Sequence, residues 1–106
     1  MDVQIKRGLL DACVLAAIKE APSYGYQIIK DLAPVAEISE STLYPILRRL
    51  EAAKQLTVES ATHNGRTRKY YHITKEGLAR IEEFKAEWRE ILSIYQFVAK
   101  EDLPRE

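Results

Sequence analysis

The stretch 39–54 constrains the fold most, because a helix through it has one apolar side and one polar side. At about 100° per residue, the apolar side collects Leu43, Ile46, Leu47, Leu50 and Ala53. The opposite side carries hydroxyl groups and a guanidinium but no carboxylate, and consists of Ser41, Tyr44, Pro45, Arg48 and Ala52. We expect Ser39 to be the N-cap of this helix. The apolar side needs a core to cover it, and the polar side suits a polyanion.

Two further helices are predicted before this stretch. Apolar residues recur at helical spacing over 8–19, which predicts the first helix. Ser23 is expected to cap a second helix, which Pro34 ends. Only residues 35–38 separate that helix from 39–54. The two helices are therefore predicted to form a helix-turn-helix whose second member carries the polar side.

The hydrophobic period changes from helical to alternating after residue 54. Alternation over 56–60 and again over 68–73 predicts two strands. Asn64-Gly65 between them is a strong turn signal, because both residue types tolerate a positive φ. We therefore expect a β-hairpin with a loop at 61–67. The tip and the outgoing strand carry three cations and no acid, Arg66, Arg68 and Lys69, which predicts a basic wing beside the polar side of the helix.

A long helix is predicted from Thr74, which is expected to cap it. Along this helix an apolar seam follows steps of three and four, and its members are Ile81, Phe84, Trp88, Ile91, Tyr95 and Val98. We expect this seam to form a dimer interface. The predicted fold class is mainly α with a small β-hairpin. A winged helix-turn-helix DNA-binding unit over 1–74 and a dimerisation helix over 75–106 are expected to form one compact unit, with a loose tail at 101–106.

Charge is distributed unevenly along the 106 residues, although the formal net charge is zero. Residues 39–74 hold six basic and three acidic side chains, whereas both ends of the chain are net acidic. Positive charge is thus concentrated on the predicted helix 39–54 and on the wing. Cys13 is the only cysteine, and the sequence shows neither an export signal nor an apolar run of membrane-spanning length. We therefore expect a cytoplasmic protein without a membrane partner.

The sequence offers few candidate catalytic or metal-binding residues. His63 and His72 flank the predicted turn, and no Cys, Asp or Glu stands at ligand spacing from them. A glycine-rich phosphate loop is also missing. The prediction is therefore that the chain is not an enzyme and holds no metal or cofactor. The two histidines are interpreted as ordinary surface residues of the strands.

Double-stranded DNA is the partner that the polar side and the wing predict. Arg48 or Arg49 could donate two hydrogen bonds to guanine, while Ser41, Thr42 and the cations of the wing could bind phosphates. The plainer interpretation is a solvated helix face with an incidental arginine. Two other classes also stay open: a winged-helix protein-interaction module that does not bind DNA, and a small-molecule sensor without DNA contacts.

Trp88 lies in the middle of the apolar seam. It could simply pack in an interface. Alternatively, two copies across a dimer axis could border a cavity for a flat aromatic effector. The candidate pocket comprises Trp88, Lys85, Leu92 and Ala12. Since Lys85 precedes Trp88 by one turn, we expect it to bring charge to the pocket, which is as compatible with an anionic ligand as with a cationic one.

Three motifs in this order carry a family resemblance: SYGYQI at 23–28, TLYPILRRLE at 42–51, and GRTRKYYHIT at 65–74, which is followed by Gly77. With them the chain resembles the PadR family of bacterial transcriptional regulators, in its short form with a single C-terminal helix. The resemblance implies a winged helix-turn-helix, a homodimer built through the first and last helices, and repression at a palindromic operator. It also implies a response to phenolic acids, drugs or other small aromatic compounds.

The same resemblance assigns roles to individual positions. The recognition helix of the family corresponds here to the stretch with Ser41, Thr42, Tyr44, Pro45, Arg48 and Arg49, and the wing to Arg66, Arg68 and Lys69. Tyr24 would open the second helix near the DNA backbone. Trp88 matches a tryptophan that some short members place at a drug-binding pore of the dimer interface. The chain departs from the family at residues 53–55, Ala-Lys-Gln, where a glycine usually follows the recognition helix.

Overall fold

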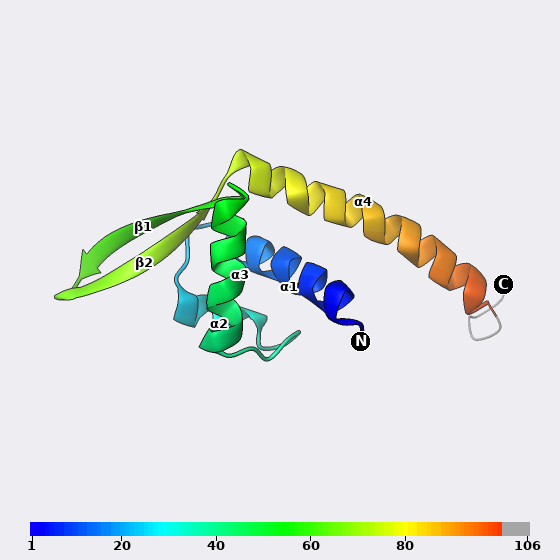
Figure 1. Cartoon of the computed structure of the whole chain (residues 1–106), viewed down its shortest axis with the longest axis horizontal. Helices are drawn as coiled ribbons and strands as arrows, with labels where there is room; N and C mark the ends of the chain where they lie inside the picture. Colours follow the sequence, from blue (N-terminus) through cyan, green and yellow to red (C-terminus); the bar gives the residue numbers. More distant parts are fainter. Residues whose placement is uncertain (101–106) are drawn as a thin grey trace.

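A computed structural model describes residues 1–100 and confirms the predicted fold class (Figure 1). Within this part of the chain, four helices and one hairpin follow each other as α1 (Val3–Ala17), α2 (Gly25–Leu32), α3 (Glu40–Ala52), β1 (Leu56–His63), β2 (Arg66–Ile73) and α4 (Lys75–Val98). The hairpin projects from one side of the three-helix body, and α4 extends from the other. The loose tail predicted at 101–106 lies outside the described residues, so the predicted C-terminal unit is described only to residue 100.

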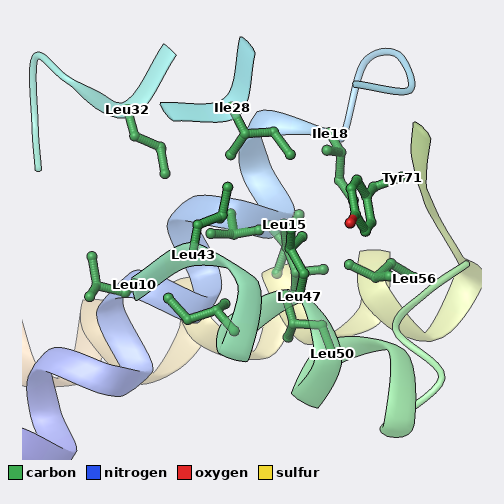
Figure 2. Packing of buried hydrophobic residues seen from close by; sticks show 13 residues of the cluster. Leu10, Leu15, Ile18, Ile28, Leu32, Leu43, Leu47, Leu50, Leu56 and Tyr71 are labelled. Atoms are coloured by element: carbon green, nitrogen blue, oxygen red, sulfur yellow. The ribbon is translucent and has the colours of Figure 1, made fainter. Parts of the chain in front are cut away.

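The hydrophobic core lies where α1, α2 and α3 meet the base of the hairpin (Figure 2). Leu15 from α1, Ile28 from α2, and Leu43 and Leu47 from α3 are almost fully buried. Each such side chain contributes about 1.5–3 kcal/mol when it leaves water. The apolar side predicted for 39–54 is therefore the side that α3 buries, except that Ala53 follows the helix as its C-cap and is exposed.

The C-terminus of α3 is a Schellman motif. The amide of Gln55 donates to the carbonyl of Leu50 at 2.9 Å, and the amide of Lys54 donates to that of Glu51 at 2.9 Å. Lys54 occupies the left-handed position of this motif with φ 61°, the conformation that glycine adopts without steric cost. The unusual residue after the recognition helix thus keeps the turn that a glycine would make.

The hairpin is longer than predicted. Antiparallel pairing runs without a break from Leu56 opposite Ile73 to His63 opposite Arg66. The turn consists of Asn64 and Gly65 alone, with φ 49° and 75°, which fits a type I′ turn. Beyond Val58, β1 is exposed on both faces, so its side chains carry no alternation to reveal it. The expectation of a loop over 61–67 was therefore wrong.

Several helix boundaries also differ from prediction. Helix α1 begins at Val3 rather than near residue 8, because the carboxylate of Asp2 caps it by accepting from the amides of Gln4 and Ile5. Ser23 is not a cap: its backbone exchanges two hydrogen bonds with Tyr71 of β2. This bridge ties the connection between α1 and α2 to the base of the wing.

Ser39 is the N-cap residue of α3, as predicted, but its hydroxyl hydrogen-bonds with that of Ser41 at 2.8 Å instead of accepting from a backbone amide. Thr74 caps α4 as predicted, because its hydroxyl accepts from the amide of Gly77 at 3.1 Å. The same hydroxyl donates to the carbonyl of Lys54 at 2.7 Å, so one side chain joins the start of α4 to the end of α3.

Helix α4 packs on α1 through its first half and then runs beyond the body, which makes the molecule about 60 Å long and 26 Å wide (Figure 1). Ile81 is buried, and Phe84 and Trp88 are half-buried. The later seam residues Ile91, Tyr95 and Val98 are exposed. Within residues 1–100, no helix combines the length and the apolar character that a membrane span requires.

Candidate nucleic-acid interface

The polar side of α3 faces solvent next to the hairpin. Ser41, Thr42 and Arg48 are exposed, Tyr44 is 37% exposed, and Pro45 is half-buried. The buried leucines of the opposite side hold α3 in this orientation, because they pack against α1 and α2. The stripe predicted from the helical wheel is therefore a surface of the folded protein.

Tyr44 separates two shallow hollows between α3 and β2. One, of about 360 Å³, is bordered by residues 24–26 at the start of α2 and by residues 67–69 of β2. The other, of about 260 Å³, is bordered by Arg48, Glu51, Lys69 and Tyr71. Gly25 makes room for the Tyr44 ring, since a Cβ at residue 25 would lie 2.8 Å from the Tyr44 hydroxyl. The two elements of the helix-turn-helix thus fit together at this tyrosine.

The wing is anchored to α2 through Tyr24. The guanidinium of Arg68 lies over the Tyr24 ring at 4.3 Å from its centroid. The Tyr24 ring also meets Tyr70 edge to face, at 5.7 Å between centroids. A cation over an aromatic face is stabilised by the quadrupole of the ring. Tyr24 and Arg68, predicted as separate contacts to a partner, are thus in contact with each other, and Arg68 is half-buried rather than free.

The remaining cations of this surface are unpaired. Arg48, Arg66 and Lys69 are exposed, and none of them forms an ion pair with another residue in the range 1–100. Burial raises the pKa of the nearby Tyr71 hydroxyl; Tyr44 and Glu51 add to the shift and Arg48 opposes it. Tyr71 is therefore neutral at physiological pH. The surface thus presents unpaired positive charge, with Arg48 and Lys69 beside the neutral Tyr71 ring.

Arg49 does not belong to this surface. Its Nη2 lies 2.7 Å from Oδ1 of Asp11 on α1, and both side chains are partly buried. Successive helical residues are about 100° apart, so Arg48 and Arg49 leave α3 in different directions. The prediction that either arginine could read a base stays a prediction, but in this structure Arg49 is paired with Asp11 and Arg48 is unpaired. Asp11 was missed, since nothing near it in the sequence indicates a partner 38 residues away.

The Trp88 region is a small groove between α1 and α4, of about 190 Å³. Trp88 lies against Phe84, with 5.9 Å between ring centroids. The other residues that border this α1–α4 groove are Gln4, Ile5, Gly8, Leu9, Arg80, Glu87 and Ile91. None of the expected pocket residues Lys85, Leu92 and Ala12 borders it. Lys85 instead pairs with Glu82 at 3.0 Å.

Charge at the α1–α4 groove comes from the ion pair of Arg80 and Glu87 rather than from Lys85 as predicted. Arg80 and Glu87 are seven residues apart and therefore lie on the same face of α4, where they pair at 3.2 Å. They were missed because a helical wheel does not show which face of α4 meets α1. Within residues 1–100, no group of three or more His, Cys, Asp or Glu side chains gathers to hold a metal ion.

A helix-turn-helix followed by a basic antiparallel hairpin defines a winged helix-turn-helix protein, a class that binds DNA. Residues 14–83 match the Transcriptional regulator PadR-like family, and the chain belongs to that family of DNA-binding transcriptional regulators. The predicted resemblance is confirmed. So is the prediction that the chain is not an enzyme, because the family and the related structures are transcriptional regulators.

Individual relatives and solved structures are similar to most of the chain. An uncharacterized protein of Lysinibacillus sphaericus is 37% identical, over 85% of this chain and 87% of its own length. The crystal structure of a PadR family transcriptional regulator from Eggerthella lenta is 36% identical, with a TM-score of 0.80 over 91% of this chain and 86% of that one. A PadR-like transcriptional regulator from Bacillus cereus is 33% identical, with a TM-score of 0.77 over 90% and 95%.

Proposed function

We propose that this regulator is a homodimeric repressor that places α3 in the major groove of a palindromic operator and the wing on the adjacent backbone. The observation that carries the proposal is the set of unpaired, exposed cations on α3 and the wing: Arg48 and Lys69 beside Tyr44, and Arg66 at the tip of the hairpin. A cation without an internal partner can neutralise a phosphate or donate to a base without breaking an existing ion pair. Repression follows from occupation of an operator that overlaps a promoter.

Within this proposal the residues have different roles. Arg48 stands in the middle of the exposed side of α3 and is the candidate for two hydrogen bonds to guanine O6 and N7. Ser41 and Thr42 lie in the first turn of α3, where hydroxyl groups suit phosphate contacts. Arg66 and Lys69 would bind the backbone from the wing. Arg68 would act mainly through Tyr24, by holding the wing against α2.

The homodimer is supported by the unburied half of the seam on α4. Ile91, Tyr95 and Val98 are 43%, 57% and 75% exposed. Such apolar side chains on a helix that runs beyond the body favour burial against a second copy. Since α4 packs along α1, the partner would meet both helices. A dimer of this kind would present two copies of α3 about one turn of DNA apart.

We further propose the α1–α4 groove as the site of a small aromatic effector. The α1–α4 groove, at about 190 Å³, is smaller than the roughly 300–1,000 Å³ of drug-sized sites. It would hold a planar ligand only if a partner subunit extends it. The aromatic pair Phe84 and Trp88 supplies a surface on which such a ligand could stack.

A direct test measures binding to DNA fragments from upstream of the coding sequence, at several salt concentrations. We expect specific binding whose logarithm falls by about 0.9 per phosphate contact on a logarithmic salt axis. Arg48→Ala should weaken operator binding by about 1–3 kcal/mol and reduce the preference over unrelated DNA. Arg89→Ala is the matched control, because Arg89 is exposed on α4 away from the recognition surface.

If Arg48→Ala and Arg89→Ala changed DNA binding equally, Arg48 would not be part of the DNA interface. If the wild-type protein retained no duplex at low salt, the proposal would be wrong, and the wing and seam would be better explained as protein contacts. Unchanged emission of Trp88 across a panel of aromatic compounds would reject the effector alone.

A further inference from the structure

The ion pair between Asp11 and Arg49 differs from every other ion pair in residues 1–100. The others join the two strands of the hairpin or lie within α4. This pair joins two helices, α1 and α3, with 2.7 Å between Nη2 and Oδ1. The side chains are 34% and 28% exposed for Arg49 and Asp11. It is therefore a partly buried, charge-assisted hydrogen bond across the helix–helix contact.

The core side of the α1–α3 contact is apolar. Leu10 of α1 and Leu43 and Ile46 of α3 belong to the same buried cluster. The free energy of apolar burial is roughly proportional to the area buried and does not depend on the direction of any one bond. A hydrogen bond depends steeply on distance and angle. The Asp11–Arg49 pair thus adds a directional restraint on the rotation of α3 to the packing of its buried leucines.

Rotation of α3 matters for DNA because Arg49 adjoins Arg48 in the chain. Any rotation that moves the Arg49 guanidinium away from Asp11 also turns the exposed side with Tyr44 and Arg48 relative to the wing. The wing itself is held by other contacts, between Arg68 and Tyr24 and between Ser23 and Tyr71. The angle between the recognition helix and the wing therefore depends on Asp11.

We infer that Asp11 is a positioning residue for operator recognition, acting through Arg49 to fix the rotation of α3. The inference rests on the proposed function of α3. Asp11 itself touches no DNA in this scheme, and Arg49 serves the fold rather than base reading. The opposite role for the same contact would be that Asp11 keeps Arg49 away from the DNA. The two roles predict opposite changes in operator affinity when Asp11 is replaced.

The experiment compares Asp11→Asn with wild-type protein on operator and on unrelated duplex, each over a series of salt concentrations. Asp31→Asn is the control, because it removes the same charge from an exposed position on α2. Relative to that control, we expect Asp11→Asn to bind the operator roughly fivefold more weakly, as suits the loss of one partly exposed ion pair. Binding to unrelated duplex and the salt slope should not change.

Two further variants keep the inference testable if Asp11→Asn folds poorly. Asp11→Glu retains the carboxylate and should recover most of the preference for the operator. Arg49→Lys retains the charge but lacks the planar fork of donors, so it should lose preference in the same direction as Asp11→Asn. Thermal unfolding monitors stability separately, and a variant that is less stable but equally selective would contradict a positioning role.

Other outcomes would overturn the inference. Tighter binding of Asp11→Asn to both duplexes, with a salt slope steeper by about 0.9, would mean that Arg49 has been released to bind a phosphate. Behaviour identical to Asp31→Asn would mean that the pair is incidental. If the wild-type protein bound no duplex, the proposed function itself would be wrong. If the wild-type protein bound the operator and Asp11→Asn bound it equally well, only the role of Asp11 would be wrong.

Discussion

Replacing Lys54 with glycine should stabilise this protein. Lys54 holds φ 61° at the end of α3, where a residue with a Cβ is destabilised by about 1–2 kcal/mol through contact with its carbonyl oxygen. Glycine avoids this contact but loses about 0.5–1 kcal/mol in chain entropy on folding. The net gain should be about 0.5–1 kcal/mol.

Removing the Lys54 side chain should cost little stability. It is exposed and forms no ion pair in residues 1–100. Its carbonyl, which accepts from Thr74, is retained in any variant. Lys54→Ala is therefore a matched control, since it removes the same side chain and keeps the Cβ.

Thermal unfolding followed by circular dichroism, at one fixed protein concentration, would measure the difference. Lys54→Gly should melt roughly 3–6 °C above Lys54→Ala, and Lys54→Ala should stay close to wild type. If the glycine variant melted at or below the alanine variant, the assignment of strain to this left-handed residue would be refuted.

Three other predictions concern separate parts of the molecule. Gly77→Ala should cost more than about 2 kcal/mol in urea unfolding, because a Cβ there would overlap the backbone oxygen of Gln55; a loss below 0.5 kcal/mol would contradict the close approach. Ile91→Glu should shift sedimentation toward the monomer, since a carboxylate is costly in an apolar interface, whereas Arg89→Glu on the same helix should not. Burial raises the pKa of the Cys13 thiol, so a thiol reagent at neutral pH should label it more slowly than a small free thiol and reach that rate in denaturant.

The spacing of hydrophobic residues was sufficient to predict a helix or strand wherever one side of that element is buried. The apolar side of α3, the strand base at Leu56 and the cap at Thr74 were predicted because each depends on residues within a turn or two of the chain. Where neither side is buried, the same reasoning failed. The outer half of the hairpin was predicted as a loop, although backbone pairing alone extends it to His63 and Arg66.

In the candidate site, too, local spacing predicted some features and tertiary contacts decided the others. Arg48 and Tyr44 could be placed on one exposed side of α3 from a helical wheel. The wheel could not show that Arg68 would lie over Tyr24, or that the charge beside Trp88 would come from Arg80 and Glu87 rather than Lys85. Each of these contacts depends on which face one element turns toward another.

The sequence by itself thus determined the kinds of element, their order, the polar side of α3 and the family to which the chain belongs. These properties follow from local spacing, because hydrophobic burial acts on every third or fourth residue of a helix and on every second residue of a strand. Only the tertiary structure decided which arginine is free. Arg48 and Arg49 are neighbours of the same chemistry, and they differ because α1 brings the carboxylate of Asp11 to one side of α3 and leaves the other side open.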